Sequence, residues 1–130
     1  MVPKFRGWDR KNHVMYDFMM MCFNVNLKNV LYRNKLTDFD VDMYTGLKDA
    51  NGKEVYEDDI LATSSRIGGK LITDYLKVDW REDYAGFFCG ETPLYACLSE
   101  WDNDIKYPQT FPEIVGNVHE NPELLEAQHD

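Results

Sequence analysis

Two clusters of carboxylate side chains are the residues of this chain best suited to chemistry. Asp38, Asp40 and Asp42 alternate along a predicted strand, about 7 Å apart on one face, and Glu57-Asp58-Asp59 crowds a predicted turn. Carboxylates of this kind could bind a divalent cation in a metal-dependent hydrolase, although the first cluster lacks the glycine and distal glutamate of an EF-hand loop and the second would need a distant carboxylate to complete a site. We interpret the first cluster as a solvated strand face that discourages edge pairing and the second as a surface turn. We therefore predict no tightly bound metal and no other cofactor.

The thiol and imidazole side chains are too scattered to predict a catalytic site. The three cysteines are an odd number without a Cys-x-x-Cys spacing, and they are Cys22, Cys89 and Cys97. We predict free thiols, partly in the core, instead of a disulfide framework or a zinc site. The three histidines are His13, His119 and His129. A nucleophile–base pair such as Cys89 with His119 needs a proximity that the spacing does not establish, so the prediction for catalytic residues is none.

The aromatic side chains give the better indication of a binding function. The chain has three Trp, eight Tyr and seven Phe, which is more than one small core needs. Aromatic anchors are enriched in protein interfaces. The candidate binding residues are Trp8, Tyr44, Tyr56, Trp80 and Trp101. The alternative is that most of them complete a small β core.

The charge is unevenly distributed along the chain. The segment up to Lys35 has a net charge of +5, the remainder has −14, and the whole chain has −9. An acidic molecule repels phosphate at long range, which argues against nucleic acid as a partner. The basic segment could still form a local patch that binds nucleic acid, or simply pair with the acidic part of the chain.

The elements that position these side chains are mostly strands. Phe39, Val41 and Met43 alternate with the aspartates, and Asp49-Ala50-Asn51-Gly52 is a strong tight-turn signal. Further strands are predicted at Phe5–Trp8, Val14–Tyr16, Phe23–Leu27, Val30–Tyr32, Val55–Tyr56, Ile60–Ala62, Leu76–Trp80, Gly86–Cys89, Leu94–Leu98 and Ile114–Val118. The run Met19–Met21 fits a helix start equally well, and Asn121-Pro122-Glu123 marks the start of a short C-terminal helix.

The pattern of many short strands predicts a mainly antiparallel β fold, as in a small barrel, with minor α content. We expect a single domain over residues 1–130, without repeats or a linker. No apolar run approaches the ~20 residues of a membrane span, and the first residues lack the apolar stretch of a signal peptide. A cytoplasmic location without membrane contact is therefore expected.

Five sequence motifs resemble the YopX family of phage and prophage proteins. They are Lys4–Asp9 (KFRGWD), Tyr44–Asp49 (YTGLKD), Asn51–Glu54 (NGKE), Val55–Ile60 (VYEDDI) and Glu113–Leu125 (EIVGNVHENPELL). The resemblance implies a mostly β fold with a small SH3-like barrel element and an origin in a phage or prophage. It implies no established activity, cofactor or catalytic residue. The family pattern has Gly where this chain has Asp58, so Asp58 is expected at positive φ if that glycine serves a turn.

These observations favour a non-catalytic binding or interaction module in the cytoplasm of a bacterial host. Its partner is expected to be a protein, which includes a second copy of the chain. The alternatives are the metal-dependent hydrolase and a barrel that binds nucleic acid through the basic N-terminal hairpin. Carboxylates around a concave pocket would favour the enzyme. An exposed aromatic patch would favour the interaction module, and a continuous basic stripe would favour the nucleic-acid binder.

Overall fold

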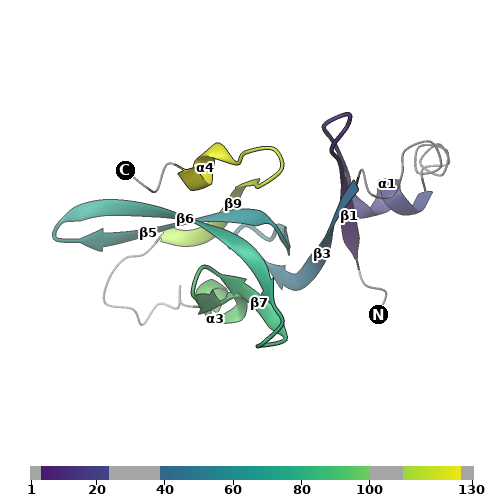
Figure 1. Cartoon of the computed structure of the whole chain (residues 1–130). Coiled ribbons are helices and arrows are strands. Elements are labelled where there is room, and N and C mark those ends of the chain that lie inside the picture. The colour runs from purple at the N-terminus through teal and green to yellow at the C-terminus, as the bar shows by residue number, and fades with distance from the viewer. Residues whose placement is uncertain (1–3, 24–38, 100–109, 127–130) are drawn as a thin grey trace. The chain divides into compact units, whose positions relative to one another are not determined.

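The computed structural model describes residues 4–23, 39–99 and 110–126, and the chain divides into two compact units (Figure 1). The first unit is Met1–Tyr44 and the second is Thr45–Asp130. The boundary falls inside one strand, β3, so both units contribute residues to it. No helix within the described residues has the length and hydrophobicity needed to cross a membrane. The single domain over residues 1–130 stays a prediction.

The described residues of the first unit form a small antiparallel sheet and a helix. Its elements are β1 (Phe5–Asp9), β2 (Val14–Tyr16), α1 (Phe18–Phe23) and the first part of β3 (Phe39–Lys48), in the sheet order β2-β1-β3. The predicted hairpin of β1 and β2 is confirmed, with Trp8 opposite Met15. The Met run is helical because the Asp17 carboxylate accepts a hydrogen bond from the Met20 amide at 2.8 Å, an N-cap. Phe23 belongs to α1, while the rest of Phe23–Leu27 lies outside the described residues, as does Val30–Tyr32.

The turn of this hairpin is held by a buried carboxylate. Asp9 Oδ1 accepts the backbone amides of Lys11 and Asn12 at 3.0 and 3.1 Å, and Oδ2 accepts the Asn12 side-chain amide at 2.8 Å. Burial alone would raise the pKa of Asp9, but the hydrogen bonds from Asn12 and Lys11 hold that pKa below its ordinary value. Asp9 is therefore ionised at neutral pH and fixes the turn.

The second unit is built on a five-stranded antiparallel sheet. Besides the last part of β3, the unit contains the strands β4 (Glu54–Tyr56), β5 (Asp59–Ile67), β6 (Lys70–Arg81), β7 (Gly86–Cys89), β8 (Thr92–Pro93) and β9 (Thr110–Asn117). Five of them follow the order β8-β7-β6-β5-β9, and β4 lies beside β3. The prediction of a mainly antiparallel β fold with minor α content is confirmed. The SH3-like barrel stays a prediction.

The predicted tight turn after β3 is confirmed, and Asp49 anchors it. The Gly52 amide donates to the Asp49 carbonyl at 3.0 Å, and Gly52 has a φ of 82°. Asp49 Oδ1 accepts the amides of Asn51 and Lys53 at 2.9 and 2.8 Å, while Oδ2 accepts the Ile114 amide of β9 at 3.0 Å. One carboxylate therefore joins the turn to a strand far along the chain.

The described part of the second unit also contains two short helices, and one of them corrects a prediction. They are α3 (Leu94–Ser99) and α4 (Glu123–Glu126). The prediction of a strand at Leu94–Leu98 is wrong, because Leu94, Cys97 and Leu98 are buried at helical spacing while Tyr95 is exposed. The C-terminal helix is confirmed just after Pro122, and it packs against β6 with its two leucines half-buried.

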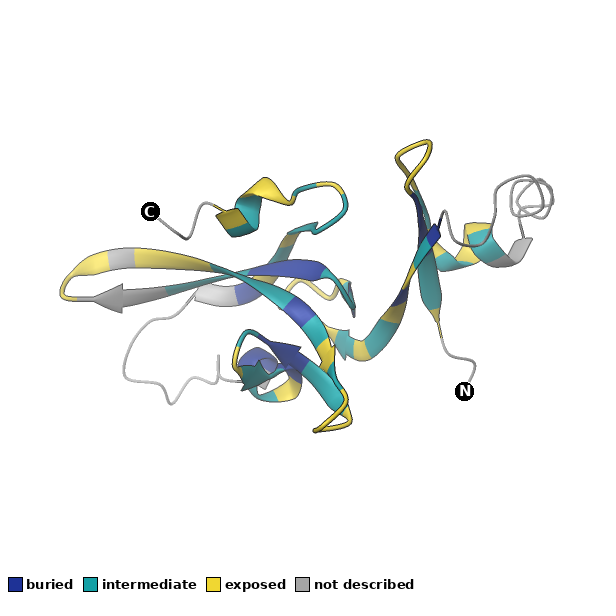
Figure 2. Cartoon of the chain, viewed as in Figure 1, coloured by how far each residue is buried: buried dark blue, intermediate teal, exposed yellow. Residues whose placement is uncertain are grey.

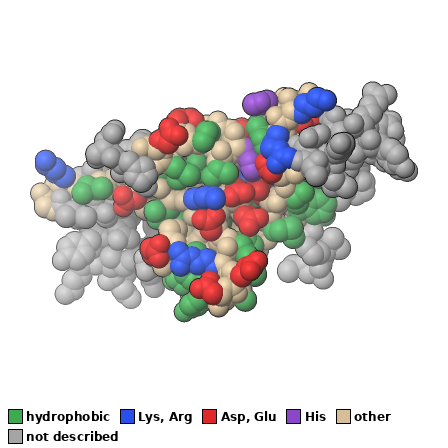
Figure 3. All heavy atoms as spheres, in the orientation of Figure 1, with side chains coloured by type: hydrophobic (Ala, Val, Ile, Leu, Met, Phe, Trp, Pro, Cys, Tyr) green, Lys and Arg blue, Asp and Glu red, His purple; other side chains and the backbone are tan. Residues whose placement is uncertain are grey.

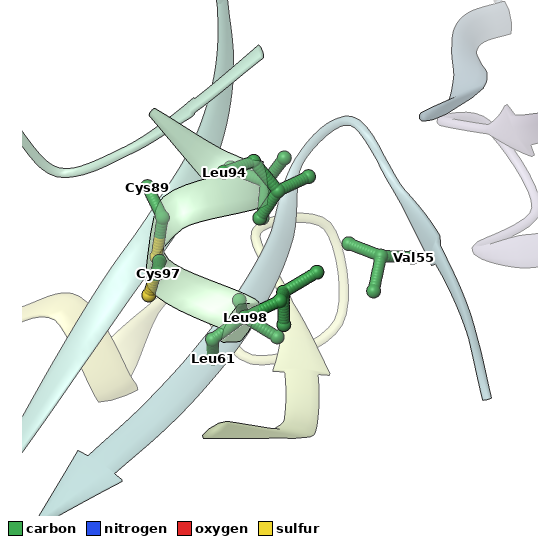
Figure 4. Close-up of a cluster of buried hydrophobic side chains, with 7 residues drawn as sticks. Val55, Leu61, Cys89, Leu94, Cys97 and Leu98 are labelled. Atoms are coloured by element: carbon green, nitrogen blue, oxygen red, sulfur yellow. The ribbon is translucent and has the colours of Figure 1, made fainter. Parts of the chain in front are cut away.

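The core of the second unit lies between α3 and the strands (Figure 4). Its buried members are Val55, Leu61, Val78, Cys89, Leu94, Cys97 and Leu98. The α3 side chains pack toward β7, and Val55 approaches from β4. Burial of each aliphatic side chain contributes roughly 1.5–3 kcal/mol, which fixes the strands at this end of the sheet. The turns and loop tips of the described residues are exposed by contrast (Figure 2).

Candidate functional site

The structure separates the five predicted binding residues. Trp8 and Tyr44 belong to the first unit, where Trp8 is buried and Tyr44 is half-buried. Tyr56 and Trp80 belong to the second unit, where Tyr56 is half-buried and Trp80 is 45% exposed. Trp101 lies outside the described residues. Trp80 is therefore the predicted residue with the most accessible ring among those the structure describes.

Trp80 stands near the end of the hairpin formed by β6 and β7. It is directly opposite Phe87, two residue pairs beyond the buried pair of Val78 and Cys89 and on the same face of the hairpin. The Trp80 and Phe87 rings meet edge to face, with centroids 5.0 Å apart and an interplanar angle of 71°. Because side chains alternate across a strand, Trp80 continues the core face of β6 outward to a point where it meets solvent.

A second aromatic group lies on the other face of the same hairpin. The Phe88 ring is buried between two partners, the Arg81 guanidinium 4.5 Å above its centroid and the Tyr84 ring at 5.1 Å. Arg81 also donates to the Gly90 carbonyl and pairs with Glu91, both at 3.3 Å. This cation–π contact and these polar contacts hold the arginine against the ring.

Tyr84 is the most exposed ring of this group. It lies in the turn between the strands and is 70% exposed, and the neighbouring Glu82 and Asp83 are exposed too. We call the set Trp80, Arg81, Tyr84, Phe87 and Phe88 the aromatic hairpin. Its turn forms an exposed end of β6 and β7 in Figure 2. Trp80 is among the predicted binding residues and Tyr84 is not, although the polar run Arg81-Glu82-Asp83 between two predicted strands indicates the turn in which Tyr84 lies.

The first carboxylate cluster is paired with arginines. Asp42 lies opposite Arg6 of β1 and forms an ion pair with it at 3.1 Å, and Asp40 pairs with Arg10 at 2.7 Å. Asp42 is buried, so the prediction of a solvated face is wrong there. The reason is the register of β1 against β3, which places basic side chains next to the acidic ones. Asp38 lies outside the described residues.

The second cluster has structural partners as well. The Asp59 side chain is buried and accepts the Tyr56 amide at 2.7 Å, which closes the turn between β4 and β5. The Asp58 carboxylate lies 3.5 Å from Lys77 Nζ and 3.8 Å from His119 Nε2. Both aspartates thus have defined roles in holding the second unit together. The prediction that the chain binds no metal tightly stays a prediction.

Asp58 occupies the left-handed backbone region that the sequence analysis expected. Its φ is 69°, its amide donates to the Val78 carbonyl at 2.8 Å, and its carbonyl accepts the Val118 amide at 2.9 Å. Burial opposes the charge of Lys77, but the hydrogen bonds and ion pairs with Asp79 and Asp58 raise the pKa of Lys77 above its ordinary value. The turn is therefore fixed by backbone and charge together.

The comparisons with known proteins identify a family and a fold. A family model described as YopX protein matches residues 4–126. The solved structure of protein EF1440 from Enterococcus faecalis is similar at a TM-score of 0.62 and 22% sequence identity, over 96% of this chain and 99% of that one. A search of the curated proteins found no match. At this identity the structural likeness supports the fold alone.

Proposed function

The chain belongs to the YopX family, and we propose that it is a non-catalytic interaction module that binds a protein partner through the aromatic hairpin. The proposal includes an origin in a phage or prophage and action in the cytoplasm of the bacterial host. The observation that carries it is that Trp80 and Tyr84 are exposed at the same end of a hairpin, one on each of its faces, so that a partner enclosing this end would contact both rings. Trp, Tyr and Arg are the residue types that most often dominate interface energies.

The aromatic hairpin is suited to binding because its geometry is set before a partner arrives. The Trp80 and Tyr84 rings each contact a ring of β7, so little side-chain freedom remains to be lost on association. An aromatic side chain buries 150–250 Å² in total, so each of these two still has about 100 Å² to bury. At about 25 cal/mol per Å² this corresponds to roughly 5 kcal/mol before the costs of association.

The charge around the hairpin points to a partner with a basic rim. Glu82, Asp83 and Glu91 are exposed near the two rings, whereas Arg81 is committed to Phe88 and Glu91. Complementary charge speeds encounter and selects partners. A second acidic copy of this chain would be repelled at the same surface, so we favour a different protein over self-association.

The two alternative functions have less support among the described residues. A hydrolase would need carboxylates available for a metal, but Asp40 and Asp42 pair with arginines and Asp59 serves a backbone turn. A nucleic-acid binder would need a continuous basic stripe. On the visible face of the described residues, Lys and Arg side chains stand apart among acidic ones instead (Figure 3).

The test is affinity capture of tagged protein from infected or lysogenic bacterial cells, with two matched variants. The double variant Trp80→Ala with Tyr84→Ala removes both exposed rings. Tyr95→Ala is the control, since Tyr95 on α3 is 69% exposed and so matches Tyr84 in type and exposure. We expect a captured protein that the control retains and the double variant loses, with an affinity reduced at least about 30-fold.

Two results would count against the proposal. A partner that the double variant retains at unchanged affinity places the interface elsewhere on the chain. A hydrolytic activity in the purified protein that disappears with Asp58→Asn would favour the enzyme instead. Thermal unfolding of each variant shows whether a loss of binding reflects a loss of the fold.

A further inference from the structure

Two thiols lie together in the core of the second unit, and neither takes part in the proposed interaction. Cys89 ends β7, Cys97 lies on α3, and both side chains are buried. Figure 4 shows their sulfur atoms next to each other, and the two thiols are hydrogen-bonded. Free thiols partly in the core were predicted, and the packing of α3 against β7 is what makes two of them adjacent.

We propose that Cys89 and Cys97 form a thiol-oxidation site, at which a small-molecule disulfide converts the two free thiols into an intrachain disulfide. A disulfide requires the two sulfur atoms to approach to about 2.05 Å. Thiols already in hydrogen-bond contact need only a small side-chain movement to reach that distance. Cys97 can supply this movement, because a residue on a short helix adjusts more easily than a residue on a paired strand.

The folded state protects the reduced pair. The thiolate is the reactive form of cysteine, and the hydrogen bond with Cys97 together with burial raises the pKa of Cys89. Reaction therefore requires a local opening that brings a thiol to solvent. The helix α3 is the element suited to open, because a helix of six residues has little stability of its own and depends on docking of Leu94, Cys97 and Leu98.

The opening distinguishes the roles of the two cysteines. Cys97 moves outward with α3, whereas Cys89 is held in β7 by its pairing with Val78 of β6. The Cys97 thiolate attacks one sulfur of the external disulfide and expels one thiolate, which leaves a mixed disulfide on Cys97. After α3 docks again, the Cys89 thiolate attacks the Cys97 sulfur and expels the second thiolate. Two protein thiols are oxidised, one external disulfide is reduced to two thiols, and the two protons pass to the leaving thiolates.

The probe for the test is oxidised glutathione, applied to the folded Cys22→Ser variant, in which Cys89 and Cys97 are the remaining thiols. We expect both thiols to disappear, the intact mass to fall by two hydrogens, and peptide mapping to link Cys89 to Cys97. The matched variant with Cys97→Ser as well should show no such link. Amide hydrogen exchange of α3 should slow by roughly tenfold or more in the oxidised protein, because the cross-link restricts opening.

Three outcomes would overturn the proposal. They are thiols that stay unreactive until global unfolding, glutathione adducts without an internal link, and disulfide-linked dimers. If Cys22→Ser fails to fold, the same mapping on the unmodified chain identifies which thiols are linked. A link that includes Cys22 would also contradict the assignment.

Discussion

Replacing Asp49 by Asn should destabilise the second unit far more than the loss of one surface charge. The Asp49 carboxylate is 6% exposed and accepts three backbone hydrogen bonds, from Asn51, Lys53 and Ile114. An asparagine oxygen can still serve the first two amides, but its NH₂ group then faces the Ile114 amide, donor against donor. A hydrogen bond to a charged group contributes about 1.5–3 kcal/mol, and a buried donor left unsatisfied costs about 1–3 kcal/mol. We therefore expect a loss of about 2–4 kcal/mol.

The assay is urea unfolding of the purified chain, followed by tryptophan fluorescence and circular dichroism. Asp74→Asn is the control, since Asp74 is an exposed aspartate on β6 and its replacement should change the free energy of unfolding by less than about 0.5 kcal/mol. An Asp49→Asn variant within about 0.5 kcal/mol of the unmodified chain would refute the reasoning. It would mean that the link from the turn to β9 contributes no stability.

Three further predictions concern local stability. Asp9→Asn should lower the free energy of unfolding at pH 7 by about 1–2 kcal/mol, measured by urea unfolding. The folded pKa of Asp9 is depressed, so its stabilisation is complete above the ordinary value of 3.8 and is lost as pH falls through the folded value. The difference between variant and unmodified chain should therefore shrink as the pH is lowered below 3.8. Leu124→Ala and Leu125→Ala should differ in their effect on the free energy of unfolding, and replacing the more buried leucine should lower it by more than about 1 kcal/mol. Equal unfolding midpoints for the two variants would indicate that α4 is not docked. Asp58→Ala should be about 1–2 kcal/mol less stable than Asp58→Gly in thermal unfolding. Both substitutions remove the carboxylate, but only alanine is strained at the positive φ of this position. Equal melting temperatures would show that the turn relaxes.

The strands of the aromatic hairpin were predictable because a turn signal separates two apolar runs there. Leu76–Trp80 is part of β6 and Gly86–Cys89 is the whole of β7, and Arg81-Glu82-Asp83 marks the turn between them. The partners of the rings were not predictable, because they depend on the register of the strands. A shift by one residue would have moved Trp80 away from Phe87 and placed the rings on opposite faces.

Other features depend on contacts that the local pattern does not encode. The apolar run at Leu94–Leu98 fits a strand as well as a helix, and packing against β7 decides for the helix. The aspartates of β3 were predicted to form a solvated strand face, but Arg6 of β1 lies opposite Asp42 and forms a buried ion pair with it. The first outcome depends on packing between neighbouring elements, and the second on a strand that is distant in sequence.

The backbone of Asp58 also limits how the gene for this protein can change. A codon for aspartate becomes a codon for glycine or asparagine by one nucleotide substitution, and these three residue types are the ones best adapted to positive φ. Another single-nucleotide neighbour, valine, is β-branched and poorly suited to that conformation. Neutral drift at this codon is therefore confined to a few residue types. A change from aspartate to glycine or asparagine removes the ion pair with Lys77 and the reverse change restores it, while the path of the backbone stays the same.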